Sequence, residues 1–108
     1  MEKLIIDIVE EFTNAPGGRL KSQGKHSGEE FREELLKPNY LEAQKSQKKL
    51  CIILDGGFGY ATSFLEEAFG GLARELRDPG LLNIEIVSEE EPALVEKINN
   101  FMKSALNR

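Results

Sequence analysis

Thr62 and Ser63 are the residues whose type and position in this sequence are best suited to chemistry. They follow the glycine-rich segment GGFG at 56–59, which itself follows the apolar run LCIIL at 50–54. A strand, a tight turn and a helix that opens with hydroxyl side chains often form a ligand site, a catalytic site or a switch in α/β proteins. Catalysis by a serine nucleophile, phosphate binding and phosphorylation are therefore the chemistries to weigh.

Catalysis by Ser63 is disfavoured by its neighbours. A nucleophile elbow needs glycines two residues on either side of the serine, and these positions hold Ala61 and Leu65. The only histidine, His26, lies in a separate polar segment and has no Cys or His companions at metal-ligand spacing. We therefore predict no enzyme activity, no metal site and no cofactor.

Phosphate binding by the glycines is a second reading of the same stretch. The segment 57–62, GFGYAT, resembles a dinucleotide fingerprint, but Thr62 stands where the third glycine belongs, and the chain has no Gly-Lys-Ser/Thr sequence. The glycines are better explained as a tight turn after a buried strand. A small domain that binds a nucleotide or a phosphate anion through this turn and Arg19 is kept as an alternative.

Ser63 also has a purely structural interpretation. The segment 63–66, SFLE, matches a capping box, in which a serine at the helix start and a glutamate three residues later satisfy backbone N–H groups. Such a cap contributes about 1 kcal/mol. Cap, partner contact and phosphoacceptor are thus the three roles to separate.

The composition is that of one globular domain, residues 1–108, with 40% hydrophobic and 31% charged residues. The net charge of −5 argues against a nucleic-acid partner. Basic residues gather in two places, at 19–25 and in the lysine-rich segment 44–50. Small basic patches on an acidic body suit a protein partner or a small anion.

Cys51 is the single cysteine, so no internal disulfide is possible, and its place in an apolar run predicts burial. No apolar stretch approaches the 18 or so residues that a membrane span needs, and no signal region opens the chain. We expect a cytoplasmic protein without membrane contact.

The hydrophobic pattern predicts an α/β fold with a mostly parallel, mixed central sheet of three to four strands and three to four helices. Expected strands are 2–12, 49–54 and 81–87, with 49–54 central and covered on both faces; a helix is the alternative for 2–12. Expected helices begin at Ser27, ending at Pro38-Asn39, near 40, at Ser63, and near Ser88 or Pro92.

Residues 13–28 form a long polar loop in this reading, with a short edge strand near 19–22. We expect the loop from Thr13 to His26 to be exposed and mobile. Arg19 is then a candidate contact for an anion or a partner.

Two segments carry a resemblance to a known family. These are PGGRLKSQGKHSGEEFREELL at 16–36 and LCIILDGGFGYATSFLEEAFGGLAREL at 50–76. Together they resemble the STAS-like domain family of unknown function, small bacterial proteins related in fold to anti-sigma factor antagonists. In those antagonists an Asp-Ser-Ser-Gly-Leu sequence opens the helix, and its second serine is phosphorylated. Ser63 takes that place here, although Ala61 replaces the acid and Phe64 the glycine.

The resemblance implies a non-enzymatic regulatory and signalling module that binds a histidine-kinase-type ATPase or a related regulator. The implied contact face runs from the turn into the helix start, with Ser63 as candidate phosphoacceptor, and comprises Gly57, Gly59, Tyr60, Thr62, Ser63, Phe64 and Glu67. A self-associating unit, such as a homodimer formed through an unpaired edge strand, is a further alternative.

Overall fold

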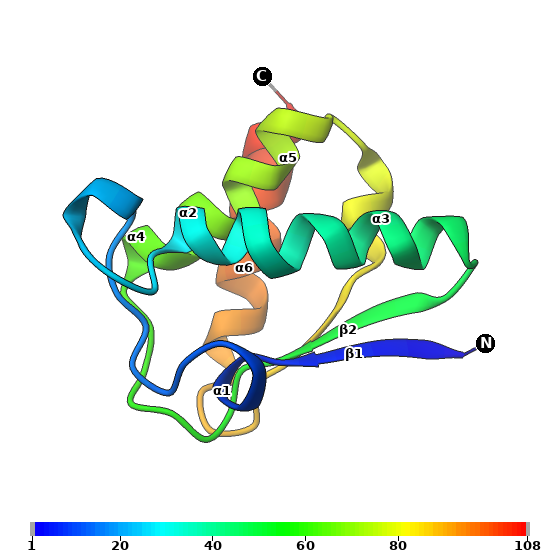
Figure 1. Ribbon diagram of the computed structural model, residues 1–108. Helices are drawn as coiled ribbons and strands as arrows, with labels where there is room; N and C mark the ends of the chain where they lie inside the picture. The colour runs from blue at the N-terminus through cyan, green and yellow to red at the C-terminus, as the bar shows by residue number, and fades with distance from the viewer. Residues whose placement is uncertain (1, 108) are drawn as a thin grey trace.

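A three-stranded parallel sheet forms one layer of the protein (Figure 1), whose computed structural model describes residues 2–107. The strand order is β1-β2-β3, and both pairs are parallel. Ile5, Cys51 and Glu85 lie side by side across the three strands. The bounds are β1 Lys3–Asp7, β2 Lys49–Ile53 and β3 Glu85–Val87. The α/β prediction and the central place of the second strand are confirmed.

Four helices connect and follow the strands in the described part of the chain, two of them built from contiguous segments with a π-helical turn in the middle. A short helix α1, Ile8–Glu11, follows β1. The first long helix joins α2, η2 and α3, at Gly28–Phe31, Arg32–Leu36 and Lys37–Lys45. The second joins α4, η3 and α5, at Thr62–Leu65, Glu66–Gly70 and Gly71–Leu76. The last helix is α6, Ala93–Leu106, and two 3₁₀ turns are η1, Lys21–Gln23, and η4, Pro79–Asn83.

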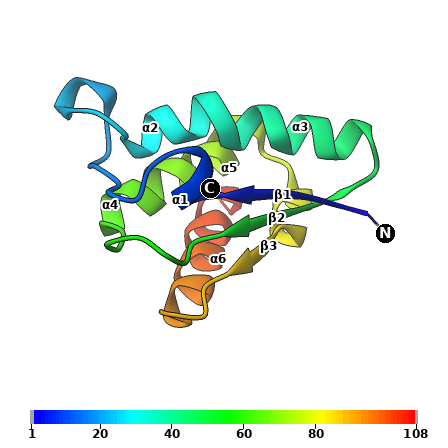
Figure 2. The ribbon, with the colours of Figure 1, turned by 60° about the horizontal axis from the view of Figure 1, so that its bottom comes forward.

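The long helices pack on one face of the sheet, so the core lies between two layers. In Figure 2 the first long helix runs above the three strands, and α5 and α6 lie behind them. Leu50 and Ile52 of β2 point into the core cluster, where they meet the buried stripe of the second long helix and that of α6. These stripes are Leu65, Ala68, Phe69 and Leu72, and Leu94, Ile98, Met102 and Ala105. The helices expected to begin at Ser63 and near Ser88 or Pro92 are thus present and cover the core.

The second face of the sheet carries Ile5, Cys51 and Glu85, and within residues 2–107 no helix packs over it (Figure 2). Lys3 Nζ lies 2.8 Å from Glu85 Oε1, an ion pair that reaches from β1 to β3 across β2. Cys51 beneath it is only 4% exposed, and this burial raises the pKa of its thiol. The apolar run of β2 therefore has helices on one face only, whereas we expected them on both.

The outer strands are shorter than the apolar patterns predicted. Asp7 ends β1 because its side chain accepts hydrogen bonds from the N–H groups of Val9 and Glu10, which starts α1. Asp78 does the same for η4 by accepting from Gly80 N–H, so the segment expected as a strand begins as a 3₁₀ turn. In both cases an aspartate caps a helical turn within or just before an apolar run.

Pro38 does not end its helix, contrary to prediction. The π turn η2 lies directly before it, and there the Lys37 N–H donates to the carbonyl of Arg32, five residues back. The chain thereby enters Pro38 as the start of a new helical segment, where a missing N–H costs little. The Asn39 side chain donates to the Leu35 carbonyl at 2.8 Å.

The loop between α1 and α2 is largely exposed, as predicted, but it contains no strand near 19–22. Its two arms are joined by the Gly17 N–H donating to His26 and the Gly28 N–H donating to Gly18, both at 2.9 Å. A side chain at Gly28 would collide with the carbonyl of Phe64, so glycine permits the contact between α2 and α4. The loop is thus held against the body at its base.

Candidate functional site

The segment after β2, residues 55–61, is fastened at four points and is called the glycine loop here. Gly56 and Gly59 adopt φ of 101° and 108°, which favours glycine. The Gly56 N–H donates to Glu90 Oε1 at 2.8 Å, and the Phe58 N–H donates to the Asn14 carbonyl at 2.9 Å. Asp55 accepts from the N–H groups of Glu89 and Glu90, each at 2.9 Å. The Tyr60 hydroxyl donates to the Leu54 carbonyl at 2.8 Å.

Phe58 stands at the exposed tip of this fastened loop. It is 85% exposed, the largest value among the exposed large hydrophobic residues of the described chain. The Gly57 backbone next to it lies close to Val9 and to the Asn14 carbonyl, so there is no room for the loop to move toward the core. An apolar ring presented to solvent by a constrained backbone is a feature of contact surfaces.

The surroundings of Phe58 are acidic. A hollow of about 210 Å³ beside it is lined by Asp55, Glu90 and Glu91 together with Tyr60 and Leu94. Burial raises the pKa of the Tyr60 hydroxyl, and the nearby carboxylates add to the rise, so the hydroxyl stays neutral. The glycine loop therefore presents an aromatic ring within a negatively charged rim.

Ser63 does not cap the helix. Helix α4 begins one residue earlier than predicted, at Thr62, with Ala61 as N-cap and no side-chain cap bond. Thr62 is exposed, and Ser63 is half-buried as the second helical residue. The capping-box interpretation of Ser63 and Glu66 is wrong, because Glu66 instead pairs with arginines.

The side chains of Phe64 and Glu67 are too buried to belong to a contact surface. The Phe64 ring is fully buried and stacks on Phe31 with ring centroids 6.0 Å apart. The side chain of Glu67 is 14% exposed and its carboxylate pairs with arginines. Of the residues named for partner contact, Gly57, Gly59, Tyr60, Thr62 and Ser63 reach the surface.

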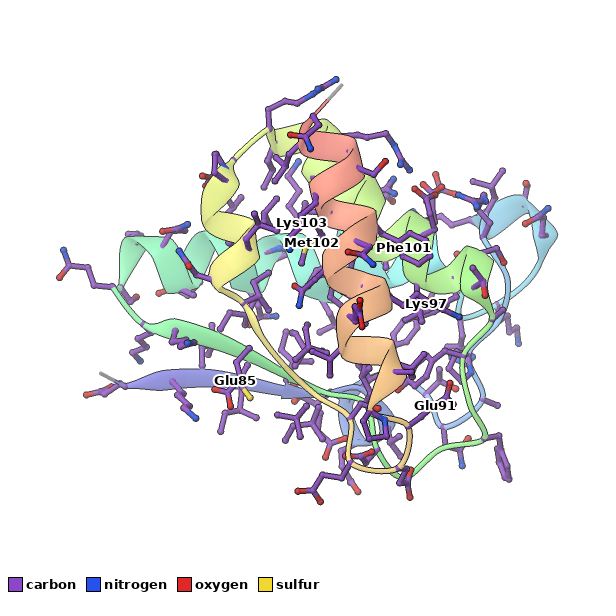
Figure 3. The ribbon with its side chains drawn as sticks, turned by 180° about the vertical axis from the view of Figure 1, so that it is seen from behind. Glu85, Glu91, Lys97, Phe101, Met102 and Lys103 are labelled. Atoms are coloured by element: carbon purple, nitrogen blue, oxygen red, sulfur yellow. The ribbon has the colours of Figure 1, made fainter. Side chains whose placement is uncertain are left out.

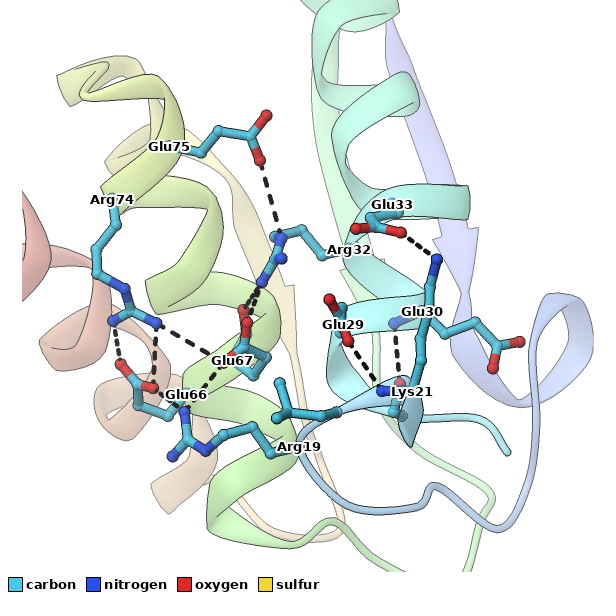
Figure 4. Close-up of polar contacts among 12 residues, drawn as sticks. Arg19, Lys21, Glu29, Glu30, Arg32, Glu33, Glu66, Glu67, Arg74 and Glu75 are labelled. Carbon is cyan, nitrogen blue, oxygen red and sulfur yellow. Dashed lines mark hydrogen bonds and ion pairs between the residues drawn. The ribbon is translucent and has the colours of Figure 1, made fainter. Parts of the chain in front are cut away.

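Glu66 and Glu67 form the centre of a charge network with three arginines (Figure 4). Glu66 lies 2.5 Å from Arg19 and 2.5 Å from Arg74. Glu67 lies 2.5 Å from Arg32 and 3.2 Å from Arg19. Each glutamate is therefore partly buried, and arginine side chains balance its charge.

The π turn η3 explains how Arg32 reaches this network. In an α-helix the Gly71 N–H would donate to the Glu67 carbonyl. Here it donates to the backbone carbonyl of Glu66 instead. Arg32 Nη1 then donates to that Glu67 carbonyl at 2.8 Å. Gly71 leaves the room for the guanidinium, since a side chain there would collide with Arg32. The two long helices are locked together where their π turns meet.

Arg19 is committed to Glu66 and Glu67, which changes its expected role. Its pKa is raised, first by the hydrogen bond to Glu66, as fits a cation held by carboxylates. Both contacts use Arg19 Nη1, so an anion at this atom would compete with the two glutamates. We therefore interpret Arg19 as the residue that ties the loop at 13–26 to helix η3.

The network should weaken in acid. The pKa of Glu66 is lowered, first by its hydrogen bond from Arg74; burial opposes a lowered pKa for Glu67, but hydrogen bonds from Arg32 and Arg19 outweigh it. A carboxyl whose folded pKa lies below its ordinary value of 4.5 stabilises the fold fully above that value. That contribution is lost as pH falls through the folded pKa.

We therefore expect urea midpoints to fall between pH 5 and pH 3, by less in the Glu66→Gln/Glu67→Gln variant than in the parent. Other paired carboxylates supply the background that both proteins share. Equal slopes in the two proteins would contradict a role for this network in acid stability.

Helix α6 supplies the remaining wall of this region. Figure 3 shows Phe101 on the side of α6 that faces the second long helix, while Glu85 lies at the sheet. Phe101 borders a hollow of about 550 Å³ with Arg19, Glu66 and Arg74. The charged groups that line the hollow already form ion pairs, because Arg19 and Arg74 both contact Glu66.

Sequence reasoning missed Phe58 and Arg32. A phenylalanine between two glycines in a turn cannot be packed by local neighbours, and this pattern could have identified the first. No signal in one sequence could have identified the second, because the Glu67 carbonyl becomes available only through a π turn.

Among the described residues, no group of three or more His, Cys, Asp or Glu side chains is arranged to hold a metal ion. The helices that the structure describes are too short or too polar to cross a membrane.

Comparison with protein families gives one match. The model of a STAS-like domain of unknown function covers residues 27–90, more than half of the chain, from the N-cap of α2 to the acidic turn after β3. Searches of curated proteins and of solved structures gave no significant match.

Proposed function

The chain belongs to the STAS-like domain family, and from that premise we propose that it is a non-enzymatic regulatory module that binds a protein partner through residues 56–63. A histidine-kinase-type ATPase or a related regulator is the partner that we propose, by analogy with the antagonists that the family resembles in fold. The observation that carries the proposal is the exposed Phe58 at the tip of a fastened loop.

Phe58 supplies the anchor of this surface. An aromatic side chain that enters a pocket on a partner typically contributes most of the affinity of its interface. The hydrogen bonds from Gly56 and Phe58 fix the loop before binding, so little conformational entropy is lost on association. The acidic rim at Asp55, Glu90 and Glu91 favours a partner pocket edged with Lys or Arg.

Ser63 supplies the proposed switch on the same surface. A phosphate there would stand three and four residues before Glu66 and Glu67, whose charges Arg19, Arg32 and Arg74 already balance. The fold should tolerate the added charge, and the helix N-terminus favours it. A partner that accepts the neutral hydroxyl would be repelled.

Nucleotide binding by the glycine loop is the weaker alternative. The N–H groups of Gly56 and Phe58 already donate to Glu90 and Asn14, so they are not available to bind a phosphate. Carboxylates line the adjacent hollow, which opposes a phosphate.

Self-association has one supporting observation, on another part of the molecule. Ile5 is 53% exposed on the open face of the sheet, between Lys3 and Asp7 on its own strand. A homodimer formed by two such faces is our second candidate, and light scattering after gel filtration separates it from a monomer that binds a different protein.

A photoreactive phenylalanine analogue at position 58, introduced into the full chain in its native cells, tests the proposed partner surface. Cross-links to a histidine-kinase-type ATPase or related regulator are expected at 58 and not at Leu82, an exposed control on the turn before β3. With that partner purified, Phe58→Ala should weaken binding about thirtyfold, the effect of an anchor residue worth about 2 kcal/mol.

Ser63→Asp should weaken binding about tenfold or more while leaving the urea midpoint unchanged, and Ser46→Asp on the exposed turn after α3 is its control. The partner surface is contradicted if positions 58 and 82 cross-link the same proteins. The switch alone is contradicted if Ser63→Asp binds as tightly as the parent.

A further inference from the structure

The glycine loop and the turn between β3 and α6 hold each other through two carboxylates. Asp55 Oδ2 and Oδ1 accept from the N–H groups of Glu89 and Glu90, each at 2.9 Å. In return, Glu90 Oε1 accepts from the Gly56 N–H at 2.8 Å. Hydrogen bonds to an ionised acceptor are stronger than those to a neutral one. Each carboxylate therefore fixes the backbone of the other segment.

Glu91 belongs to the same acidic rim but takes no part in these bonds. It lines the hollow beside Phe58, and Figure 3 shows it just before α6. Its backbone carbonyl accepts from the Ser88 hydroxyl at 2.7 Å, whereas within residues 2–107 its carboxylate has no hydrogen-bond or ion-pair partner. The Glu91 carboxylate can therefore turn toward a cation without releasing the glycine loop, which the Glu90 carboxylate cannot do.

We infer that the carboxylates around Phe58 have two different roles in the partner surface. Glu90 is a positioning residue that keeps the loop in the shape that presents the ring, and Asp55 holds the turn that carries Glu90. Glu91 is a specificity-determining residue that pairs with a Lys or Arg at the edge of the partner's pocket. This inference rests on the proposed partner surface at 56–63 and names the carboxylate that recognises the charge of the partner.

The positioning role of Glu90 follows from the exposure of the loop. Residues 56–59 are exposed, so few packing contacts hold them. Without the Glu90 acceptor, the Gly56 N–H would turn to water, and the loop would depend on the bond from the Phe58 N–H to the Asn14 carbonyl. A mobile loop has to be ordered again when the ring enters a pocket, which weakens binding.

Backbone ¹⁵N relaxation of the purified full chain tests the positioning role without a partner. We expect order parameters of about 0.85 at 56–59 in the parent and below about 0.6 in Glu90→Ala, the values typical of rigid and flexible backbone. Glu90→Gln keeps an oxygen that can accept from the Gly56 N–H, so it should restore the parent values. Glu89→Ala on the same exposed turn is the control and should leave the loop rigid.

Affinity for the partner captured at position 58 tests the role of Glu91. Glu91→Gln should weaken binding about fivefold at low salt and by less at high salt, because an exposed ion pair at the rim is screened by ions. Its order parameters at 56–59 should equal those of the parent. Glu89→Gln removes the same charge from the same turn but outside the hollow, and it should leave affinity unchanged. Glu90→Ala should weaken binding at both salt concentrations.

A loop that stays rigid in Glu90→Ala would overturn the positioning role, and so would a Glu90→Gln loop as mobile as that of Glu90→Ala. A Glu91→Gln protein that binds as tightly as Glu89→Gln would overturn the specificity role. If position 58 captures no partner while Glu90→Ala still loosens the loop, the proposed function fails together with the role of Glu91, and the positioning of the loop by Glu90 stands.

Discussion

Leu72→Asp is expected to abolish the cooperative unfolding transition of the domain. Leu72 is 1% exposed and lies in the buried stripe of α5 that packs in the core. Burial of an unpaired carboxylate costs several kcal/mol, a large part of the 5–15 kcal/mol that stabilises a typical domain. Urea denaturation followed by circular dichroism measures the effect.

Leu41→Asp is the matched control for this change. Leu41 lies in a helix as well, α3, but it is 47% exposed, so the same substitution should change stability by about 0.5 kcal/mol or less. A Leu72→Asp protein that still unfolds in one cooperative step would show that the packing of α5 against the sheet is wrong.

Arg32→Gln is expected to lower the free energy of unfolding by about 3 kcal/mol. The Arg32 and Glu67 side chains are 13% and 14% exposed, so removal of the guanidinium leaves a largely buried carboxylate with Arg19, at 3.2 Å, as its remaining close partner. The Glu67 carbonyl also loses its donor, because the π turn has diverted the Gly71 N–H. Both penalties follow from the same substitution.

A double-mutant cycle with Glu67→Gln isolates the pair. Arg32→Gln/Glu67→Gln should cost less than the sum of the single changes, because neither charge then remains without its nearest partner. Lys21→Gln, which removes an exposed partner of Glu33, should cost about 0.5 kcal/mol or less. Additive single effects would mean that the Arg32–Glu67 contact contributes nothing specific.

The periodic patterns predicted the elements that carry the core. The stripe from Leu65 to Leu72 and the stripe from Leu94 to Ala105 are buried, because a spacing of three and four places these residues on one helical face. The apolar run at 50–54 also gave the central strand correctly. Burial of apolar faces dominates the energy of such elements, so local sequence suffices to find them.

The wrong predictions concern the ends of helices and strands, where two local structures were both compatible with the sequence. Asp7 and Asp78 start helical turns inside or beside apolar runs, and Pro38 is accommodated by the π turn that precedes it. Ser63 could not be ranked against Ala61 as N-cap, because the outcome depends on Glu66, whose carboxylate is held by Arg19 and Arg74. The N-cap at Ala61 thus depends on a contact distant in the sequence, whereas Asp7, Asp78 and Pro38 depend on local hydrogen bonds that the apolar pattern does not reveal.

The reactivity of the buried Cys51 thiol can be used to measure local opening of this protein. It is the single cysteine of the chain, and it lies at the middle of the central strand beneath the Lys3–Glu85 ion pair. A colourless disulfide reagent can reach it when the side chains over it, the Lys3–Glu85 pair among them, move aside, so the rate of colour formation reports openings of this face of the sheet. Divided by the rate for an unfolded cysteine peptide, it gives the opening equilibrium without denaturant, fluorophore or engineered residue. The same measurement can be made with the partner present, and it would show whether binding stabilises the sheet.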